Sequence, residues 1–286
     1  MMSKAVSLRK IKSVKKSANH MFLNLPYLVW SLLFIIVPIF IVAYFCFTDD
    51  SGAFTLANFA QLPKYKDNII DSFIYAFIAT VITLLLAYPF AYFMTKCSQS
   101  SQKIMLMLVM VPVWMNLLIL TYSIMNIIET NGLINSVLEF FGFEKLKMIN
   151  TPGAVIFGMV YNYFPYMVLP LYSVLSKIDN SLLEAASDLG SNAISKFRRV
   201  ILPLSLSGII SGVTMVFVPS VSTFYISQKL GGTGVLMIGD IIENLVNKVP
   251  TRNVGAMLSF VLMIVILISL MIMNRFSDDD DGGIII

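Results

Sequence analysis

Apolar residues are concentrated in six long windows that contain no Asp, Glu, Lys or Arg. These windows cover residues 17–48, 72–95, 104–128, 148–176, 200–228 and 253–274. Each exceeds the ~20 helical residues that cross ~30 Å of hydrocarbon at 1.5 Å per residue. Backbone amides in lipid must be paired within their own segment, so each window predicts a membrane-spanning α-helix. The pattern therefore predicts an all-α, polytopic membrane protein with six spans.

The composition agrees with this prediction. Of 286 residues, 57% are hydrophobic and only 13% are charged, against roughly 25% charged residues in soluble domains. The net charge of +4 does not indicate nucleic-acid binding, because many of the basic residues form one block within residues 1–20. A basic block beside an apolar window is typical of a topology signal.

The distribution of Lys and Arg predicts the orientation. These residues favour the cytoplasmic side, and most of the 20 fall on one side if the N-terminus is cytoplasmic. Both termini are then cytoplasmic. The organisation that follows is a basic cytoplasmic segment over 1–20, a six-helix domain over 21–276 and an acidic C-terminal tail over 277–286.

The chain offers little for catalysis or metal binding. His20 is the only histidine, and the two cysteines, Cys46 and Cys97, are expected on opposite membrane faces. No Cys/His cluster has ligand spacing, and no acids or bases converge at membrane depth. A G-x-x-x-x-G-K-[ST] phosphate loop is also absent from the sequence. We expect neither an enzyme nor a cofactor-binding protein.

The most polar stretch between spans is residues 181–203, which the predicted topology puts in the cytoplasm. Ser181 and Glu184 have capping-box spacing, and Gly190 can take the left-handed conformation that ends a helix. A second helix is expected to start at Ser191 or Asn192. The segment thus predicts a helix, a glycine turn and a second helix. An ordinary amphipathic loop packed on its own bundle is the alternative.

The same stretch resembles the EAA motif of permease subunits of ABC importers: E-A-A, three residues, G, nine residues and I-x-L-P. The matching residues are Glu184, Ala185, Ala186, Gly190, Leu202 and Pro203, and only the isoleucine differs, as Val200. The resemblance implies a type I importer permease fold. It also implies that these residues form coupling helices that dock on a cytoplasmic ATPase. Asp188, Lys196, Arg198 and Arg199 are the candidate charged contacts.

In this family two ATPase copies bind ATP and Mg²⁺, and a second permease subunit completes the pathway. The resemblance therefore implies these partners, an extracytoplasmic binding protein, and a place in the bacterial inner membrane. The stretch G-I-I-S-G at 208–212 has small-residue spacing that suits close helix packing. That packing could involve the second permease subunit or this subunit alone.

Residues 131–135, 161–179, 219–227 and 231–246 are similar to spermidine/putrescine permeases of the B type. This similarity implies a polyamine substrate and a C-type permease as the second subunit. One departure is Leu120, at a position where relatives commonly carry an arginine. A permease for another small solute, or a secondary transporter, remains the alternative.

Several residues could line a pathway for ammonium groups. Acids on the predicted outer side can attract cations, and aromatic faces stabilise ammonium groups by ~0.5–2 kcal/mol each. The candidates are Trp114, Tyr161, Tyr163, Phe224 and Tyr225 as aromatic residues, Asn116, Asn162, Ser222 and Thr223 as polar lining, and Asp240 and Glu243 as acids. Aromatic belts at the membrane interface and solvated loops are the alternative interpretations.

Overall fold

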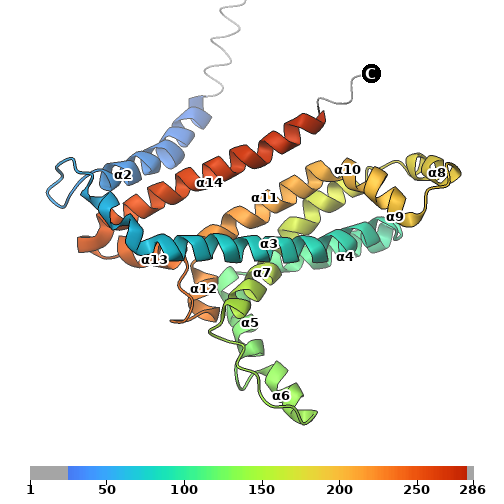
Figure 1. Cartoon of the computed structure of the whole chain (residues 1–286), viewed down its shortest axis with the longest axis horizontal. Coiled ribbons are helices and arrows are strands. Elements are labelled where there is room, and N and C mark those ends of the chain that lie inside the picture. Colours follow the sequence, from blue (N-terminus) through green and yellow to red (C-terminus); the bar gives the residue numbers. More distant parts are fainter. Residues whose placement is uncertain (1–24, 282–286) are drawn as a thin grey trace, which may run out of the picture.

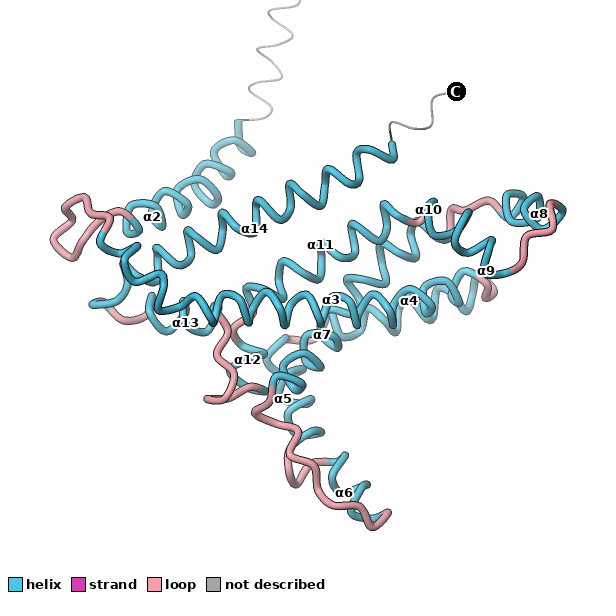
Figure 2. Tube along the Cα trace, viewed as in Figure 1, coloured by secondary structure: helices cyan, strands magenta, loops and turns pink. Residues whose placement is uncertain are grey.

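The computed structural model describes residues 25–281, which form helices joined by short connections (Figures 1 and 2). The first span, Leu25–Cys46, includes η1 (Leu32–Ile36) and α2 (Val37–Cys46). The remaining elements are η2 (Ala57–Tyr65), α3 (Lys66–Thr95), α4 (Gln99–Trp114), α5 (Leu117–Ile128), α6 (Leu133–Phe140), α7 (Pro152–Leu175), α8 (Asn180–Asp188), α9 (Ala193–Lys196), η3 (Phe197–Ile201), α10 (Leu202–Leu204), α11 (Leu206–Ser222), α12 (Tyr225–Leu230), α13 (Ile238–Val246), η4 (Val249–Thr251) and α14 (Arg252–Asp281). Across the described range, one isolated bridge, Thr48–Phe54, is the only β-structure. The all-α prediction is confirmed.

The number of candidate spans is close to the six apolar windows, although one of them, Leu117–Phe140, overlaps the third window (104–128) only in part. Five helices among the described residues are long and apolar enough to cross a membrane. Residues Ala193–Leu204 and Leu206–Ser222 meet at a 65° bend and provide the sixth if they count as one span. The basic segment 1–20 lies outside the described residues. The last helix, α14, runs to Asp281 and so includes the first residues of the acidic segment 277–286.

The third window, 104–128, does not form one helix, so the prediction of a continuous span is wrong there. Met115 has an extended backbone with ψ of 150°, and it separates α4 from α5. Asn116 then caps α5, because its Oδ1 accepts the Leu118 amide at 2.8 Å. A local cap thus ends an apolar run that would otherwise suit one helix. Beyond the break, α5 and α6 leave the long helices as an arm (Figure 1).

The core lies where α3, α7 and α11 pack on one another. Glycines allow α11 to approach α7: a Cβ on Gly208 would lie 3.0 Å from the Pro170 carbonyl oxygen, and one on Gly212 would meet Met167. The small-residue stretch 208–212 therefore packs within this subunit. Fully buried alanines, including Ala87, line the α3 side of the same cluster.

A second, smaller cluster joins α14 to α13 and to the end of the first span. Cys46, Ile238, Met257 and Leu258 are buried in it. Most of the rest of the first span is exposed, and no residue of its most apolar window is buried. An apolar helix with so little cover within its own chain has a surface suited to lipid or to another membrane subunit.

We expect the Gly208→Leu variant to be less stable than the parent protein, because the added side chain must push α11 away from the Pro170 backbone. Overpacking of this kind costs about 1–3 kcal/mol, which should lower the unfolding temperature in detergent by about 5 °C. Gly153→Leu is the matched control, since its Cβ would meet only Thr151 Oγ1 at 3.7 Å. Equal unfolding temperatures for the two variants would contradict this account of the core.

Candidate functional site

The first candidate site is the coupling segment, residues 180–204, which connects α7 to α11. Its first helix, α8, is capped by Asp179, whose Oδ1 accepts the Ser181 amide at 2.9 Å. Hydrogen bonds from Ser181 also hold the pKa of Asp179 below its usual value. The prediction that Ser181 begins the helix in a capping box with Glu184 is therefore wrong. Asp179 takes that position two residues earlier, because an aspartate is at least as good a cap.

The glycine turn forms as predicted. Gly190 has φ of +76°, a conformation that favours glycine. The amide of Gly190 donates to the Ser187 carbonyl at 2.8 Å, and the amide of Ser191 donates to the Ala186 carbonyl at 3.0 Å. These two bonds make a Schellman motif, which leaves α8 with a defined end. Asn192 then caps the next helix through its Oδ1, which confirms one of the two predicted starts.

The second half of the segment is tied back to the first. Lys196 Nζ donates to Ser187 Oγ at 3.0 Å, which links α9 to α8. Arg198 and Arg199 are exposed on the wide π-helical turn η3 that follows. Leu202 packs against the main core, whereas Pro203 is exposed near the start of α10. The segment therefore consists of short helices that are linked to each other by a hydrogen bond and that pack against the core near both ends of the segment.

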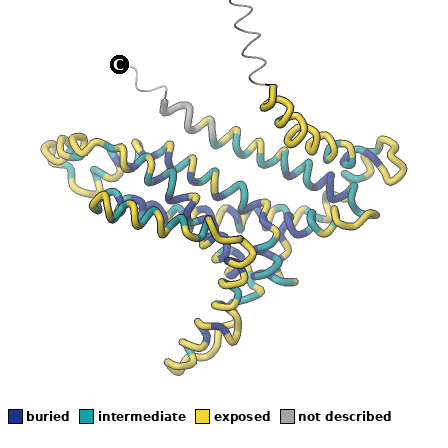
Figure 3. Tube along the Cα trace, turned by 180° about the vertical axis from the view of Figure 1, so that it is seen from behind, coloured by how far each residue is buried: buried dark blue, intermediate teal, exposed yellow. Residues whose placement is uncertain are grey.

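The tip of the coupling segment is exposed and partly apolar. Leu189 is 87% exposed and Ile194 is 71% exposed on either side of the glycine turn. Glu184, Ala185 and Asp188 are also exposed, while Ala186 is half-buried. Figure 3 shows this end as largely exposed, in contrast to the long helices. Apolar side chains held out by a rigid turn form a surface suited to contact with another protein.

The second candidate site is the chain from α11 to α13, where the fifth window also breaks. The helix α11 ends at Ser222, and Thr223 is extended with ψ of 139°. A Cβ on Gly239 would lie 2.5 Å from the Thr223 carbonyl oxygen, so only glycine lets α13 approach this break so closely. The result is a short helix, α12, followed by a glycine-rich turn and α13, all outside the long spans.

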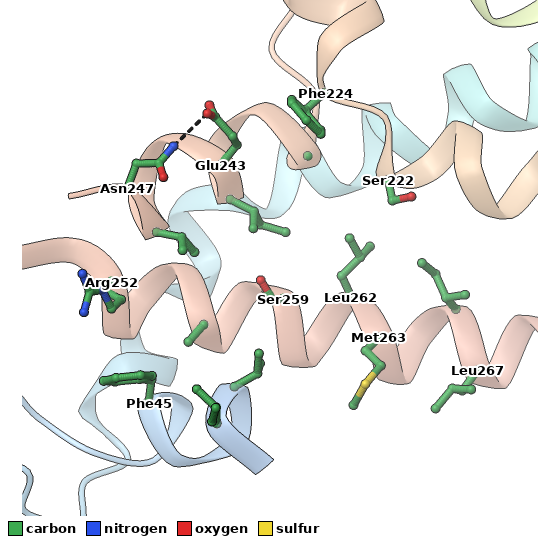
Figure 4. A pocket seen from close by; sticks show the side chains of 17 residues that line it. Phe45, Ser222, Phe224, Glu243, Asn247, Arg252, Ser259, Leu262, Met263 and Leu267 are labelled. Carbon is green, nitrogen blue, oxygen red and sulfur yellow. Dashed lines mark hydrogen bonds between the residues drawn. The ribbon is translucent and has the colours of Figure 1, made fainter. Parts of the chain in front are cut away.

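Three of the predicted pathway residues line one groove of about 960 Å³ between α2, α13 and α14. They are Ser222, Phe224 and Glu243. Figure 4 shows them on the opposite side of the groove from α14, with the Glu243 carboxylate turned toward Asn247. Glu243 accepts hydrogen bonds from Gln228 at 3.2 Å and from Asn247 at 2.8 Å. Two neutral donors therefore fix the Glu243 carboxylate at the groove. This carboxylate can interact with a cation.

Asp240 is near this groove but is not part of its lining. It lies one helical turn before Glu243 and is fully buried. Its Oδ2 accepts the Met237 amide at 2.9 Å, which starts α13, and its Oδ1 is buried with no hydrogen-bond partner among the described residues. Burial raises the pKa of Asp240 to about 6. In this structure the side chain caps α13, and its burial disfavours the charged form of the carboxyl group.

The other predicted pathway residues lie elsewhere in the fold. Trp114 is 72% exposed at the end of α4, beside the cap Asn116. Tyr161 lines a separate apolar pocket of about 510 Å³ between α3, α4 and α7. Asn162 and Tyr163 are buried in α7, where Asn162 donates to the Gly158 carbonyl at 2.8 Å. The structure therefore brings together only part of the predicted set.

One contact of this region was not predicted. Lys229 Nζ lies 5.2 Å from the ring centre of Tyr122 and 5.7 Å from that of Tyr225. It joins α12 to the arm helix α5, on which Leu120 is buried. Tyr122 and Lys229 are far apart in the chain, so no spacing in the sequence signals the pair. Tyr225 is thus already in contact with a cation of this chain.

Comparison with known proteins identifies the family. The sequence profile of the binding-protein-dependent transport system inner membrane component matches residues 84–279, which include both candidate sites. The chain belongs to this family. As a member of the binding-protein-dependent permease family it is a multi-pass membrane transport component, and this confirms the resemblance found in the coupling segment.

The related proteins are permeases. The spermidine/putrescine transport system permease protein PotB of Escherichia coli strain K12 is 37% identical over 258 residues, which cover 87% of this chain and 94% of that protein. The protein of the same name from Haemophilus influenzae is 39% identical over 225 residues, which cover 75% of this chain and 79% of that protein. A crystal structure of a bacterial ABC transporter that imports alginate has a chain with a TM-score of 0.75 at 16% identity, covering 95% of this chain and 99% of that one. This structural likeness confirms the importer permease fold.

We expect Asp240→Asn to change how stability depends on pH. The folded protein raises the pKa of Asp240 to about 6 from 3.8, so folding favours the protonated form. Stability from this group is therefore present at low pH and is lost as the pH rises from about 4 to about 6. The Asn variant keeps an acceptor for the Met237 amide without the buried charge.

The two proteins should have similar unfolding temperatures near pH 4. Above pH 6 the Asn variant should be more stable, by on the order of 2 kcal/mol. Thermal unfolding in detergent between pH 4 and pH 8 measures this difference. A difference that does not vary with pH would contradict the assignment to Asp240.

Proposed function

We propose that this chain is the B-type permease subunit of an ATP-driven importer that takes up polyamines such as spermidine and putrescine. The support for the substrate is the identity of 37–39% with PotB proteins over most of the chain. The support for ATP-driven coupling is the exposed coupling segment. Its matched residues, Glu184, Ala185, Ala186 and Gly190, lie on one braced end of the bundle.

In this proposal a separate ATPase binds ATP and Mg²⁺, because the chain has no phosphate loop. Two ATPase copies dock on the coupling segments of this subunit and of a C-type permease. A polyamine-binding protein delivers the substrate on the opposite side. The α8 end and both termini are then cytoplasmic, and the α13 end is outside.

The substrate would meet the α13 groove on its way through the membrane. Glu243 supplies a carboxylate and Phe224 an aromatic face, and both groups favour an ammonium. Arg252 also lines the groove but lies over the Phe45 ring, with the centre of the guanidinium 5.8 Å from the ring centre. Few charges and much apolar surface suit a site of passage, where an ion must enter and leave easily.

The coupling assignment predicts different effects for two substitutions of Gly190. Gly190→Val should weaken binding of the ATPase, because a left-handed backbone costs an ordinary residue about 1–2 kcal/mol and a β-branched residue more. Gly190→Asn should keep most of the ATPase binding, because asparagine tolerates the left-handed conformation. A Cβ at Gly190 would contact nothing within 4 Å, so the backbone alone is tested.

The measurement is copurification of the ATPase with the tagged permease from membranes that contain both proteins. Both variants should accumulate in the membrane to the same level. If Gly190→Val retains the ATPase as well as the parent protein does, the coupling segment is not the docking surface.

The substrate assignment predicts that Glu243→Gln lowers spermidine uptake by about threefold to tenfold, through loss of a charge that favours the ammonium. The amide can still bond to Asn247, so the local fold should persist. Glu139→Gln is the matched control, since Glu139 is exposed on α6 and pairs with Lys145 at 3.4 Å. Uptake of labelled spermidine into proteoliposomes of the full assembly measures the effect. Equal uptake by the two variants would remove Glu243 from the pathway.

A further inference from the structure

The bend between the coupling segment and α11 lies at one residue, Ser205. Helices on its two sides, Ala193–Leu204 and Leu206–Ser222, meet at 65°. Ser205 has φ of −96° and ψ of 3°, and its amide still donates to the Ile201 carbonyl at 3.0 Å. The residue is fully buried. The bend is therefore a defined part of the core and not a loose connection.

A chain of hydrogen bonds joins this bend to α3. The Tyr88 hydroxyl lies 2.8 Å from Ser205 Oγ. The Ser205 hydroxyl donates to the Leu202 carbonyl at 3.0 Å. A serine hydroxyl has one hydrogen, so Tyr88 is the donor to Ser205. Tyr88 is itself buried in the main core, which makes α3 the fixed point against which the bend is held.

The Tyr88 ring makes a second contact, on the near side of the bend. It meets the Phe197 ring edge-on, with ring centres 5.6 Å apart and planes at 87°. Phe197 begins η3, the π-helical turn of the coupling segment. Single π turns within helices are frequent at functional positions. Rotation of the coupling segment relative to α3 must therefore change the ring contact, the hydroxyl contact or both.

We propose that Tyr88 and Ser205 form a latch that sets the angle of this bend, so that movement of the coupling segment is passed to α11. The transport role of the latch rests on the proposed coupling to an ATPase. Tyr88 is a positioning residue here, because it acts through the bend and through Phe197. A bend angle that separates the hydroxyls leaves a buried donor without its partner, which disfavours angles other than the one observed.

The direction of the bonds makes the two hydroxyl deletions unequal. Ser205→Ala leaves the buried Tyr88 hydroxyl without its acceptor. Tyr88→Phe leaves Ser205 still bonded to Leu202, so its effect should be smaller. The double variant should recover to the level of Tyr88→Phe, because it has no unpaired donor. Tyr166→Phe is the matched control, since Tyr166 is 38% exposed and lies outside the latch.

The first experiment measures the bend itself and needs neither an ATPase nor a substrate. Spin labels at Ile194→Cys and Met215→Cys lie on exposed positions on the two sides of the bend. They are introduced into the full chain with Cys97→Ser, and the distance distribution between them is recorded. We expect the distribution to broaden at least about twofold in Ser205→Ala and less in Tyr88→Phe. Unchanged distributions in both variants would overturn the latch.

The second experiment uses the full assembly in proteoliposomes, with ATP and labelled spermidine. We expect Ser205→Ala to retain the ATPase and to hydrolyse about threefold to tenfold more ATP per spermidine transported, with partial rescue in the double variant. An unchanged ratio, or an equal change in Tyr166→Phe, would overturn the role of the latch in transport. Failure of the parent chain to bind the ATPase would instead overturn the proposed function, while the distance measurement still decides the latch.

Discussion

The close approach of α7 and α11 is the contact on which the rest of the structure depends. Gly208 and Gly212 bring the α11 backbone against Pro170 and Met167, where any larger residue would have to displace a neighbour. The coupling segment begins where α7 ends and leads into α11, so both of its roots lie in this one contact. The far end of α11 leads directly into the break at Ser222 and the groove beside α13.

Local signals in the sequence predict many of these features correctly. The apolar windows locate the spans, the position of Gly190 predicts a left-handed turn, and Asn192 predicts a helix start, because each effect acts within a few residues. The same local reasoning fails where two signals compete. Asp179 caps α8 in place of Ser181, and the cap at Asn116 interrupts an otherwise uninterrupted apolar run.

Contacts between distant parts of the chain could not be predicted in this way. The pairs Tyr88–Ser205 and Tyr122–Lys229 depend on how helices pack, and a single sequence has no periodicity that reveals them. The acids of α13 show the same limit. Asp240 and Glu243 look equivalent in sequence, yet one is a buried helix cap and the other lines the groove. Burial, and not residue type, separates their roles.

The two roots of the coupling segment also affect how the subunit responds to force. A segment attached to a single helix could transmit force to the bundle only by twisting that helix. Here α8 follows α7 and α10 leads into α11, and the hydrogen bond from Lys196 to Ser187 links the two halves of the segment. A load applied to the tip would therefore reach both α7 and α11, and through Val221 of α11 it would also reach the second cluster, which holds α14 and the end of the first span.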